Sequence, residues 1–224
     1  MFKTETHLHT KETSSCSRLF AKEMVELYHN AGYKTIFVSD HMHHDFLEAN
    51  SDVSREEAVR RFLSGYNNAK AEAEKYGMNV LLSTEYSLTF GNIDSHYLVY
   101  GIDEDFLLEN ANCADFTLER LRAATKKKGA LLIEAHPFRG VCIPTPTFVD
   151  GVEIYNPNPR HFVESDEVRT LEIAKLYGLY ISAGSDAHRT EDIAGSGMGS
   201  DHEIKTAEDF IELIKSGKGT VLRK

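Results

Sequence analysis

The sequence predicts an α/β protein in which strand–helix units build a parallel sheet, closed or wound, within one domain. Short apolar runs alternate with amphipathic stretches along all 224 residues, an order typical of strands joined by crossover helices. No low-complexity linker or internal repeat divides the chain. Hydrophobic residues make up 41% of it, which is enough for a sizeable core at this length. We therefore expect residues 1–224 to form a single domain.

The first elements are a strand, a helix and a second strand. Residues 3–8 and 35–40 read as strands, and the second is a β-branched run typical of full burial. Residues 19–31 between them have helical periodicity, which Gly32 ends. Their apolar side chains fall near one helical face: Phe20, Met24, Leu27, Tyr28 and Ala31.

A long helix and a hairpin are expected next. Ser54 and Glu57 have the spacing of a capping box, so we expect a helix from there to about Tyr76. Residues 79–88 and 95–102 then read as strands. The turn residues between them predict a hairpin.

The carboxyl-terminal half repeats the strand–helix order. Strands are expected over 130–136, 151–156, 179–188 and 220–223. Helices are expected over 117–128, about 165–177, and from Thr206 and Asp209 to near Gly217. The glycine-rich segment 189–202 lacks the ending of a phosphate-binding loop, so we interpret it as a flexible loop, with a lid as the alternative.

Charge and cysteine content narrow the possible partners and compartment. The formal net charge of −10 gives no general attraction for nucleic acid or anionic membrane, although bound cations can still make one pocket positive. Cys16, Cys113 and Cys142 have no paired spacing, which fits a reducing compartment. The sequence has neither the pattern of a secretory signal nor an apolar run of membrane-spanning length. We expect a cytoplasmic protein without membrane or nucleic-acid partners.

Ionisable residues gather where the predicted strands end. His7 and His9 end the first strand, and alternate strand residues face the same side, so both imidazoles can face one metal. Other strands end or begin with similar residues: Asp40 and His41, Glu85, His96, His136, and Asp186 with His188. Since chemistry in such folds lies at the carboxyl ends of strands, these side chains should converge.

A metal centre explains this set better than separate structural roles do. Singly, an H-x-H pair or a buried glutamate is an ordinary core feature. Together, so many buried ionisable groups would cost several kcal/mol without cations. The mixed nitrogen and oxygen donors fit zinc, manganese or iron, and are too rich in nitrogen for calcium or magnesium.

The motifs resemble, in order, those of the PHP family (polymerase and histidinol phosphatase). They are HLH at 7–9, SDH at 39–41, Glu85 after an apolar strand, AHP at 135–137 and SDAH at 185–188. The resemblance covers most of the chain. It implies a distorted, TIM-like (β/α)7 barrel with two or three divalent metal ions (Zn, Mn or Fe) at the carboxyl ends of the strands.

The resemblance also implies the ligands of each metal. For the first metal they are His7, His9, Glu85 and Asp186. For the second they are Glu85, His96 and His136, so Glu85 would bridge. For the third they are His41 and His188, and Glu12 is placed as its remaining protein ligand. Cys16 is interpreted as a bystander.

The implied reaction is metal-assisted hydrolysis of a small-molecule phosphate mono- or diester. A hydroxide held between two metals would attack phosphorus, and the metals would neutralise the developing charge. Asp186 or His188 could pass a proton to the leaving oxygen. Asp40 faces away from its neighbour His41 and is expected to support the ligands or accept a proton. Arg139 is a candidate clamp for the phosphate.

Other residues have weaker claims, and other functions stay open. Arg160, Arg189, Asn156, His43 and His44 could each touch substrate or lie in solvent. A histidinol-phosphatase-type monoesterase, an amidohydrolase-like hydrolase, a nuclease and a non-enzymatic metal-binding protein are the alternatives. The lack of a basic stripe disfavours the nuclease, and the full ligand set disfavours the non-enzymatic protein.

Overall fold

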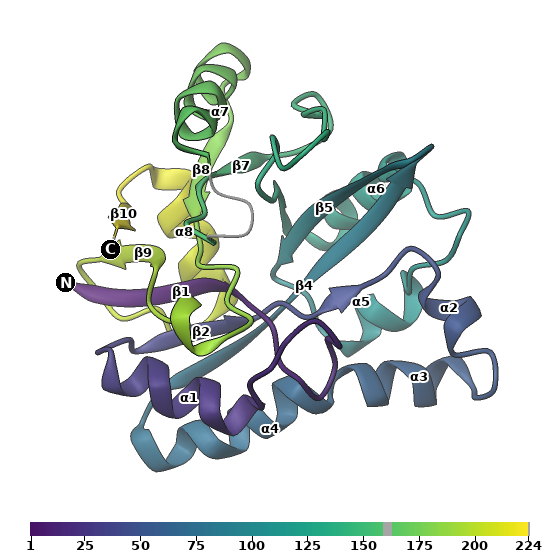
Figure 1. Ribbon diagram of the computed structural model, residues 1–224, viewed down its shortest axis with the longest axis horizontal. Helices are drawn as coiled ribbons and strands as arrows, with labels where there is room; N and C mark the ends of the chain where they lie inside the picture. Colours follow the sequence, from purple (N-terminus) through teal and green to yellow (C-terminus); the bar gives the residue numbers. More distant parts are fainter. Residues whose placement is uncertain (159–162, 224) are drawn as a thin grey trace.

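The computed structural model describes residues 1–158 and 163–223, whose strands form one strongly curved, nearly closed barrel-shaped sheet (Figure 1). The strands are β1 (Phe2–Leu8), β2 (Thr35–Val38), β3 (His41–Met42), β4 (Asn79–Phe90), β5 (Ile93–Tyr100), β6 (Leu131–Glu134), β7 (Gly151–Tyr155), β8 (Tyr180–Ala183), β9 (Ser196–Ser200) and β10 (Thr220–Arg223). Their order in the sheet is β10-β9-β1-β2-β4-β5-β6-β7-β8, and β3 pairs with β4. The predicted mixed α/β barrel is thus confirmed.

Helices cover the outside of this sheet, as Figure 1 shows for α1 and α4 below β1 and β2. The α-helices are α1 (Ala21–Asn30), α2 (Phe46–Ala49), α3 (Arg55–Phe62), α4 (Ser64–Ala73), α5 (Glu104–Glu109), α6 (Leu118–Lys128), α7 (Glu164–Tyr177) and α8 (Ala207–Ser216). Short 3-10 helices are η1 (Glu74–Tyr76) and η2 (Thr190–Asp192). No helix in the described part of the chain is both long and apolar enough to cross a membrane.

The chain after β8 closes the barrel against β1. Leu8 and Ala187 form a parallel bridge, the amide of His9 donates to the carbonyl of Ala187 at 3.0 Å, and the amide of Ala187 donates to the carbonyl of His7 at 3.2 Å. Ala187 lies between Asp186 and His188. This seam of contacts therefore places Asp186 and His188 beside His7 and His9. Residues from the two ends of the sequence therefore meet in one place.

The β4–β5 hairpin is confirmed, but it is longer than predicted. Glu85 does not end its strand, because β4 continues to Phe90 and pairs antiparallel with β5 across a tight turn. At Gly91 the backbone has φ +65°, a conformation glycine adopts without strain. Glu85 also pairs in register with His41 of β3, so the two residues lie side by side.

Two predicted helical features differ in detail. The long helix predicted up to Tyr76 is broken into α3, α4 and η1. Ser54 caps α3 by accepting from the amide of Glu57, whereas the Glu57 carboxylate pairs with Arg60 and Arg61 in the next turn. In α1, Phe20 is 47% exposed, so the buried face is formed instead by Ala21, Met24, Val25 and Tyr28.

The segment 189–202 contains the 3-10 helix η2 and the buried strand β9, so its interpretation as a flexible loop or lid was wrong. Its β9 is buried throughout and pairs antiparallel with both β1 and β10. The glycines permit this position, because a Cβ at Gly197 would lie 2.4 Å from the carbonyl oxygen of Thr4 on β1.

Apolar packing fills the space beneath the carboxyl ends of the strands. Phe37, Tyr100 and Phe210 pack with ring centroids 4.8–5.1 Å apart, and Phe210 belongs to α8. The Tyr100 hydroxyl donates to the carbonyl of Thr6 at 3.0 Å, which ties β5 to β1 just before His7. This packing gives the ligand-bearing strand ends a rigid base.

Candidate metal centre

The predicted ligands other than Glu12 converge on one buried cluster at the ends of β1, β3, β6 and β8 and within the β4–β5 hairpin. Three overlapping groups have ligand atoms within 4.8 Å of one another: His7, His9, Glu85 and Asp186; His41, Glu85 and His96; and His9, His41 and His188. The first group contains the same four residues that the resemblance implied for the first metal.

Glu85 lies at the centre of the cluster and is fully buried. Its carboxylate oxygens approach five imidazoles, with nitrogen–oxygen distances of 2.8 Å for His41, 2.9 Å for His96, 3.2 Å for His136, 3.3 Å for His9 and 3.4 Å for His7. A carboxylate shared in this way can bridge two cations.

The donor atoms lie close to one another, yet several of them form no hydrogen bond. The buried side-chain atoms without a hydrogen-bond partner among the described residues include His7 Nε2, both ring nitrogens of His9, His41 Nδ1, Glu85 Oε2 and Asp186 Oδ1. Each such atom costs about 1–3 kcal/mol when buried unpaired. Cations held between them would use the carboxylate oxygens and the one lone pair of each neutral imidazole, so the residues fit divalent metals with nitrogen and oxygen ligands.

The pKa shifts show how strongly the charges are coupled. Burial and the neighbouring His41 and His188 hold the pKa of His9 well below its usual value, so this ring stays neutral, as a metal ligand must be. Burial alone would lower the pKa of His7, but nearby carboxylates, first Glu153 and then Glu85, raise it well above its usual value. In the absence of cations, protonated imidazoles therefore balance the carboxylates.

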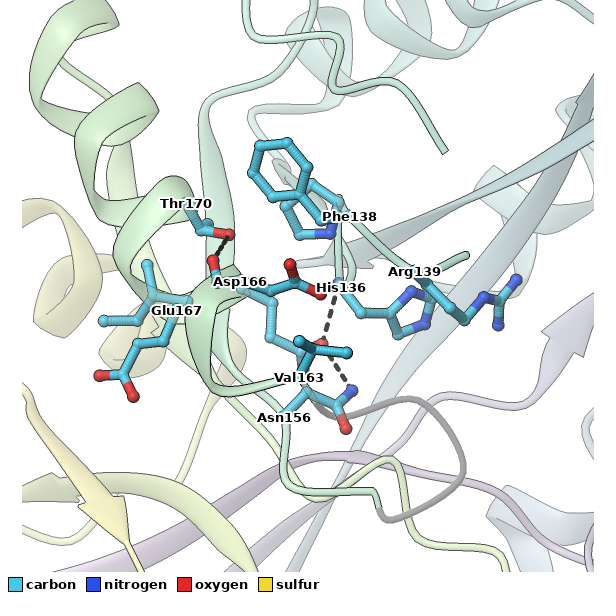
Figure 2. A pocket seen from close by; sticks show the side chains of 11 residues that line it. His136, Phe138, Arg139, Asn156, Val163, Asp166, Glu167 and Thr170 are labelled. Carbon is cyan, nitrogen blue, oxygen red and sulfur yellow. Dashed lines mark hydrogen bonds between the residues drawn. The ribbon is translucent and has the colours of Figure 1, made fainter. Parts of the chain in front are cut away.

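Glu153 of β7 is a functional residue that the sequence analysis missed. Its carboxylate lies 3.0 Å from His7 Nδ1 and accepts from the His136 amide at 3.2 Å and the Asn156 side chain at 2.8 Å, as the dashed lines of Figure 2 partly show. A His7 ring that donates from Nδ1 to Glu153 presents the Nε2 lone pair to the cluster. The signal was a single acid inside the apolar strand GVEIY.

Glu5 of β1 is a second buried acid that the sequence analysis missed. It accepts hydrogen bonds from the amides of His7 and Ser185, both at 2.9 Å, and from the hydroxyls of Tyr28 at 2.7 Å and Ser185 at 2.6 Å. Burial raises the pKa of Glu5, although these hydrogen bonds oppose the shift. The carboxylate thus ties the strand that carries His7 to the segment that carries Asp186.

Two residues of the cluster have left-handed backbone conformations. His136 has φ 29° and Asp186 has φ 49°, values that non-glycine residues seldom adopt. Asn158, also missed in the sequence, donates from its side chain to the Asp186 carbonyl at 2.9 Å. Such conformations persist where surrounding contacts hold them, which is typical of functional sites.

Asp40 holds the loop after β1 in place. None of the hydrogen bonds described for its side chain goes to the side chain of a proposed metal ligand. Its buried carboxylate accepts from the Thr10 amide at 2.7 Å, the Thr10 hydroxyl at 2.6 Å and the Ser14 hydroxyl at 2.7 Å. Ser14 in turn accepts from the amide of His41 at 3.0 Å. Burial raises the pKa of Asp40 to about 6, because desolvation outweighs these hydrogen bonds.

We expect Asp40→Asn to lower the free energy of unfolding by about 2 kcal/mol, since an amide nitrogen cannot accept the hydrogen bonds that both carboxylate oxygens accept from Thr10 and Ser14. Urea unfolding above the pKa of Asp40 measures this effect. Asp52→Asn is the control, because Asp52 is 73% exposed and only 3.9 Å from Arg61, so its loss should change stability by less than about 0.5 kcal/mol. Equal effects in both variants would contradict the role given to Asp40.

Glu12 occupies a place different from the one expected. Glu12 accepts from the Ala21 amide at 2.9 Å and from Asn68 at 3.2 Å, so it caps α1 and is not in any of the close ligand groups of the described residues. Cys16 is exposed and also lies outside these groups, although His41 and His188 are near enough to affect its thiol. Burial alone would raise its pKa, but these two histidines lower it to about 6.

Arg139 reaches the cluster from the loop after β6. Its Nη2 lies 3.0 Å from His96 Nε2. Figure 2 shows Arg139 beside His136, with Asn156 facing the same small cavity of about 30 Å³. A larger cavity of about 220 Å³ is lined by His41, His43, Phe46, Arg61 and Phe62 among others. The guanidinium is therefore within reach of an anion bound at the cluster.

The remaining weaker candidates are scattered. His43 is exposed, lines the larger cavity and stacks on His41 with ring centroids 5.3 Å apart. His44 is exposed. Arg189 lies 3.9 Å from Glu191, and Arg160 lies outside the described residues.

Comparison with known proteins gives a partial sequence match and a full-length fold match. Residues 168–218 match a family model described as PHP-associated. No curated protein matches the sequence. A protein from Bifidobacterium adolescentis, assigned as a metal-dependent phosphoesterase, has the same fold with a TM-score of 0.59 and 15% identity, over 96% of both chains.

Two further solved structures widen the range of chemistry. An amidohydrolase from Chromobacterium violaceum with bound sulfate has a TM-score of 0.61 and 16% identity, over 99% of this chain and 98% of that one. A lesion-specific endonuclease from Pyrococcus furiosus has a TM-score of 0.63 and 12% identity, over 98% of this chain and 57% of that one. This chain therefore shares the fold of these structures over nearly its whole length and matches the PHP-associated model over residues 168–218.

Proposed function

We propose that this protein hydrolyses a phosphoric ester of a small molecule with the help of two or three divalent ions (Zn, Mn or Fe). The observation that carries the proposal is the buried Glu85 carboxylate, which five imidazoles approach while several donor atoms have no hydrogen bond among the described residues. We assign a first cation to His7, His9, Glu85 and Asp186. We assign a second to Glu85, His96 and His136.

The chain's own residues prepare the site for this chemistry. Bound divalent ions supply an acidified water and neutralise charge on phosphoryl oxygens. Glu153 orients His7, and Arg139 lies close enough to bind an oxygen of the phosphate through its fork of N–H donors. Asp186 and His188 face the cluster and are assigned here as metal ligands. Solvent, and neither of these side chains, would then pass a proton to the leaving oxygen.

The cavity next to His41 supports a small substrate. Its walls include the rings of Phe46 and Phe62 beside the charged side chains of Glu12, Asp45 and Arg61, which suits an organic group with both apolar and polar parts. Its volume of about 220 Å³ matches a small molecule better than a duplex. Asp40 would act only by holding the loop that lines this side.

Nuclease and amidohydrolase activities are the alternatives. The endonuclease and amidohydrolase that share this fold mean that the comparisons do not support excluding nucleic acid or amide substrates. The net charge of −10 still disfavours a nucleic-acid substrate, because phosphate backbones bind positively charged surfaces.

A substrate panel tests the proposal. The protein loaded in turn with Zn, Mn or Fe(II) should release phosphate or alcohol from small phosphate mono- or diesters, and a chelator should stop this. Single-stranded and abasic DNA, and amides or lactones, form the other arms. Turnover of an amide or of DNA with none of the small phosphate esters would overturn it.

A further inference from the structure

The exposed ring of His43 lies against the buried cluster. His41 stacks on His9 with ring centroids 4.1 Å apart and on His43 with centroids 5.3 Å apart, at interplanar angles of 17° and 26°. His9 is fully buried and His43 is exposed, so these ring contacts lead from inside the cluster to the surface. Among the residues that the structure describes, His41 is the one ring that stacks on His43. The face of the His43 ring that turns away from His41, its outer face, is therefore open to a ligand.

Backbone hydrogen bonds hold the turn that carries His43. Its carbonyl accepts from the amide of Phe46 at 3.0 Å. Asn112 fixes the chain on both sides of this turn: its side chain donates to the carbonyl of Met42 at 3.1 Å, and its carbonyl accepts from the amide of Leu47 at 3.0 Å. Because the turn is fixed before a ligand arrives, little ordering is needed for the ring to make a contact.

Aromatic rings surround the cavity of about 220 Å³ that His43 lines. Phe46 and Phe62 also line it and pack edge to face with their centroids 5.7 Å apart. A cavity of about 150 Å³ is large enough for one benzene molecule, so this one has room for a ring and its substituents. His41 lines the same cavity and belongs to the close ligand groups, so the cavity adjoins the proposed cations.

We propose that this cavity binds the alcohol part of the phosphoric ester through a planar aromatic ring, which stacks on the outer face of His43. A phosphate held at the cluster and a ring held in the adjoining cavity then belong to one small molecule. Stacked aromatic pairs stabilise a complex beyond the area that they bury, so this contact favours a flat ring over a puckered one of similar size. His43 would select the leaving group without touching the reacting atoms. The inference rests on the proposed function, which supplies the phosphoric ester.

A matched pair of phosphonates tests this contact without turnover. Benzylphosphonate and cyclohexylmethylphosphonate both resist hydrolysis, but the first has a flat ring and the second a puckered one. In calorimetric titrations of the zinc-loaded protein, benzylphosphonate should bind about three- to tenfold more tightly, the effect of one aromatic pair. His43→Ala should remove this preference. His43→Phe should keep it, because a phenyl ring can stack in the same way.

Hydrolysis of benzyl phosphate and cyclohexylmethyl phosphate gives a second measurement. His43→Ala should raise KM for benzyl phosphate by the same factor and leave kcat nearly unchanged, since the lost contact is equal in the ground and transition states. His44→Ala is the matched control, because His44 is the next residue, is exposed and is not among the described residues that line the cavity. It should keep the preference for the flat ring.

Three results would overturn the inference: no binding of either phosphonate, equal affinity for the two, or an unchanged preference in His43→Ala. Loss of the preference in His43→Phe as well as in His43→Ala would also overturn it, because the ligand would then need the imidazole nitrogens and not a ring face. Wild-type protein that shows the preference but hydrolyses no phosphate ester would instead overturn the proposed function alone.

Discussion

Replacing Glu85 by glutamine is expected to reduce hydrolysis by at least about 10³-fold, the scale lost when one preorganised electrostatic stabiliser is removed. Glutamine keeps the shape of the side chain but removes the charge shared by five imidazoles. It also places an amide N–H₂ group among ring nitrogens that need an acceptor or a cation. Both the first and the second proposed cation should be lost together, because each uses this carboxylate.

Elemental analysis of the desalted protein and the initial rate of ester hydrolysis measure this loss. Glu134→Gln is the matched control, because Glu134 is also a buried strand glutamate, but it accepts from the Thr145 amide at 2.9 Å and lies outside the ligand groups found among the described residues. It should keep its cations and most of its activity. A Glu85→Gln protein with full metal content and near-normal turnover would remove the basis of the proposed mechanism.

Replacing Glu153 by alanine is expected to weaken metal binding by about ten- to a hundredfold, the usual effect of removing a carboxylate behind a metal-bound histidine. The change frees the Nδ1 side of His7 and leaves the His136 amide and the Asn156 side chain without their acceptor. Glu153→Gln should have a smaller effect, since its amide oxygen can still accept from His7.

Competition with a coloured chelator gives the affinity of each variant. The same titrations should show that alanine, and glutamine to a lesser extent, lowers affinity without changing the number of cations bound at saturation. Glu172→Ala, a change at a surface residue of α7, is a suitable control. Unaltered affinity in Glu153→Ala would mean that the ring of His7 is held by its packing and not by this carboxylate.

The residue types of the cluster could be read from the sequence, because histidines and acids recur where apolar strands stop. Their supporting residues could not. Glu5, Glu153 and Asn158 act through hydrogen bonds to segments far away in the chain, and no local spacing reveals such partners. Glu12 was placed among the ligands for the same reason, since only the folded chain shows that its carboxylate accepts from the amide of Ala21.

Local sequence patterns gave wrong predictions where tertiary contacts determine the structure. The glycines of 196–200 suggested mobility, whereas they allow β9 to lie against β1. The sequence alone did not show where β4 ends. The strand extends past Glu85 because it pairs with β5 as far as Phe90. The alternation of strands and helices and the β4–β5 hairpin were nevertheless predictable, because apolar periodicity and turn residues are local signals.

The seam between Leu8 and Ala187 means that the cluster is assembled late. Glu5 and Ser185, which are bonded across it, stand 180 residues apart in the sequence. During synthesis from the amino end, His7 and His9 emerge early and must wait for Asp186 and His188 before a complete coordination sphere exists. Cations that bind only the finished arrangement then favour the native state by mass action. The bound ions would therefore link residues from the two ends of the chain. Removal of the metal should first increase the rate at which the contacts of this seam open.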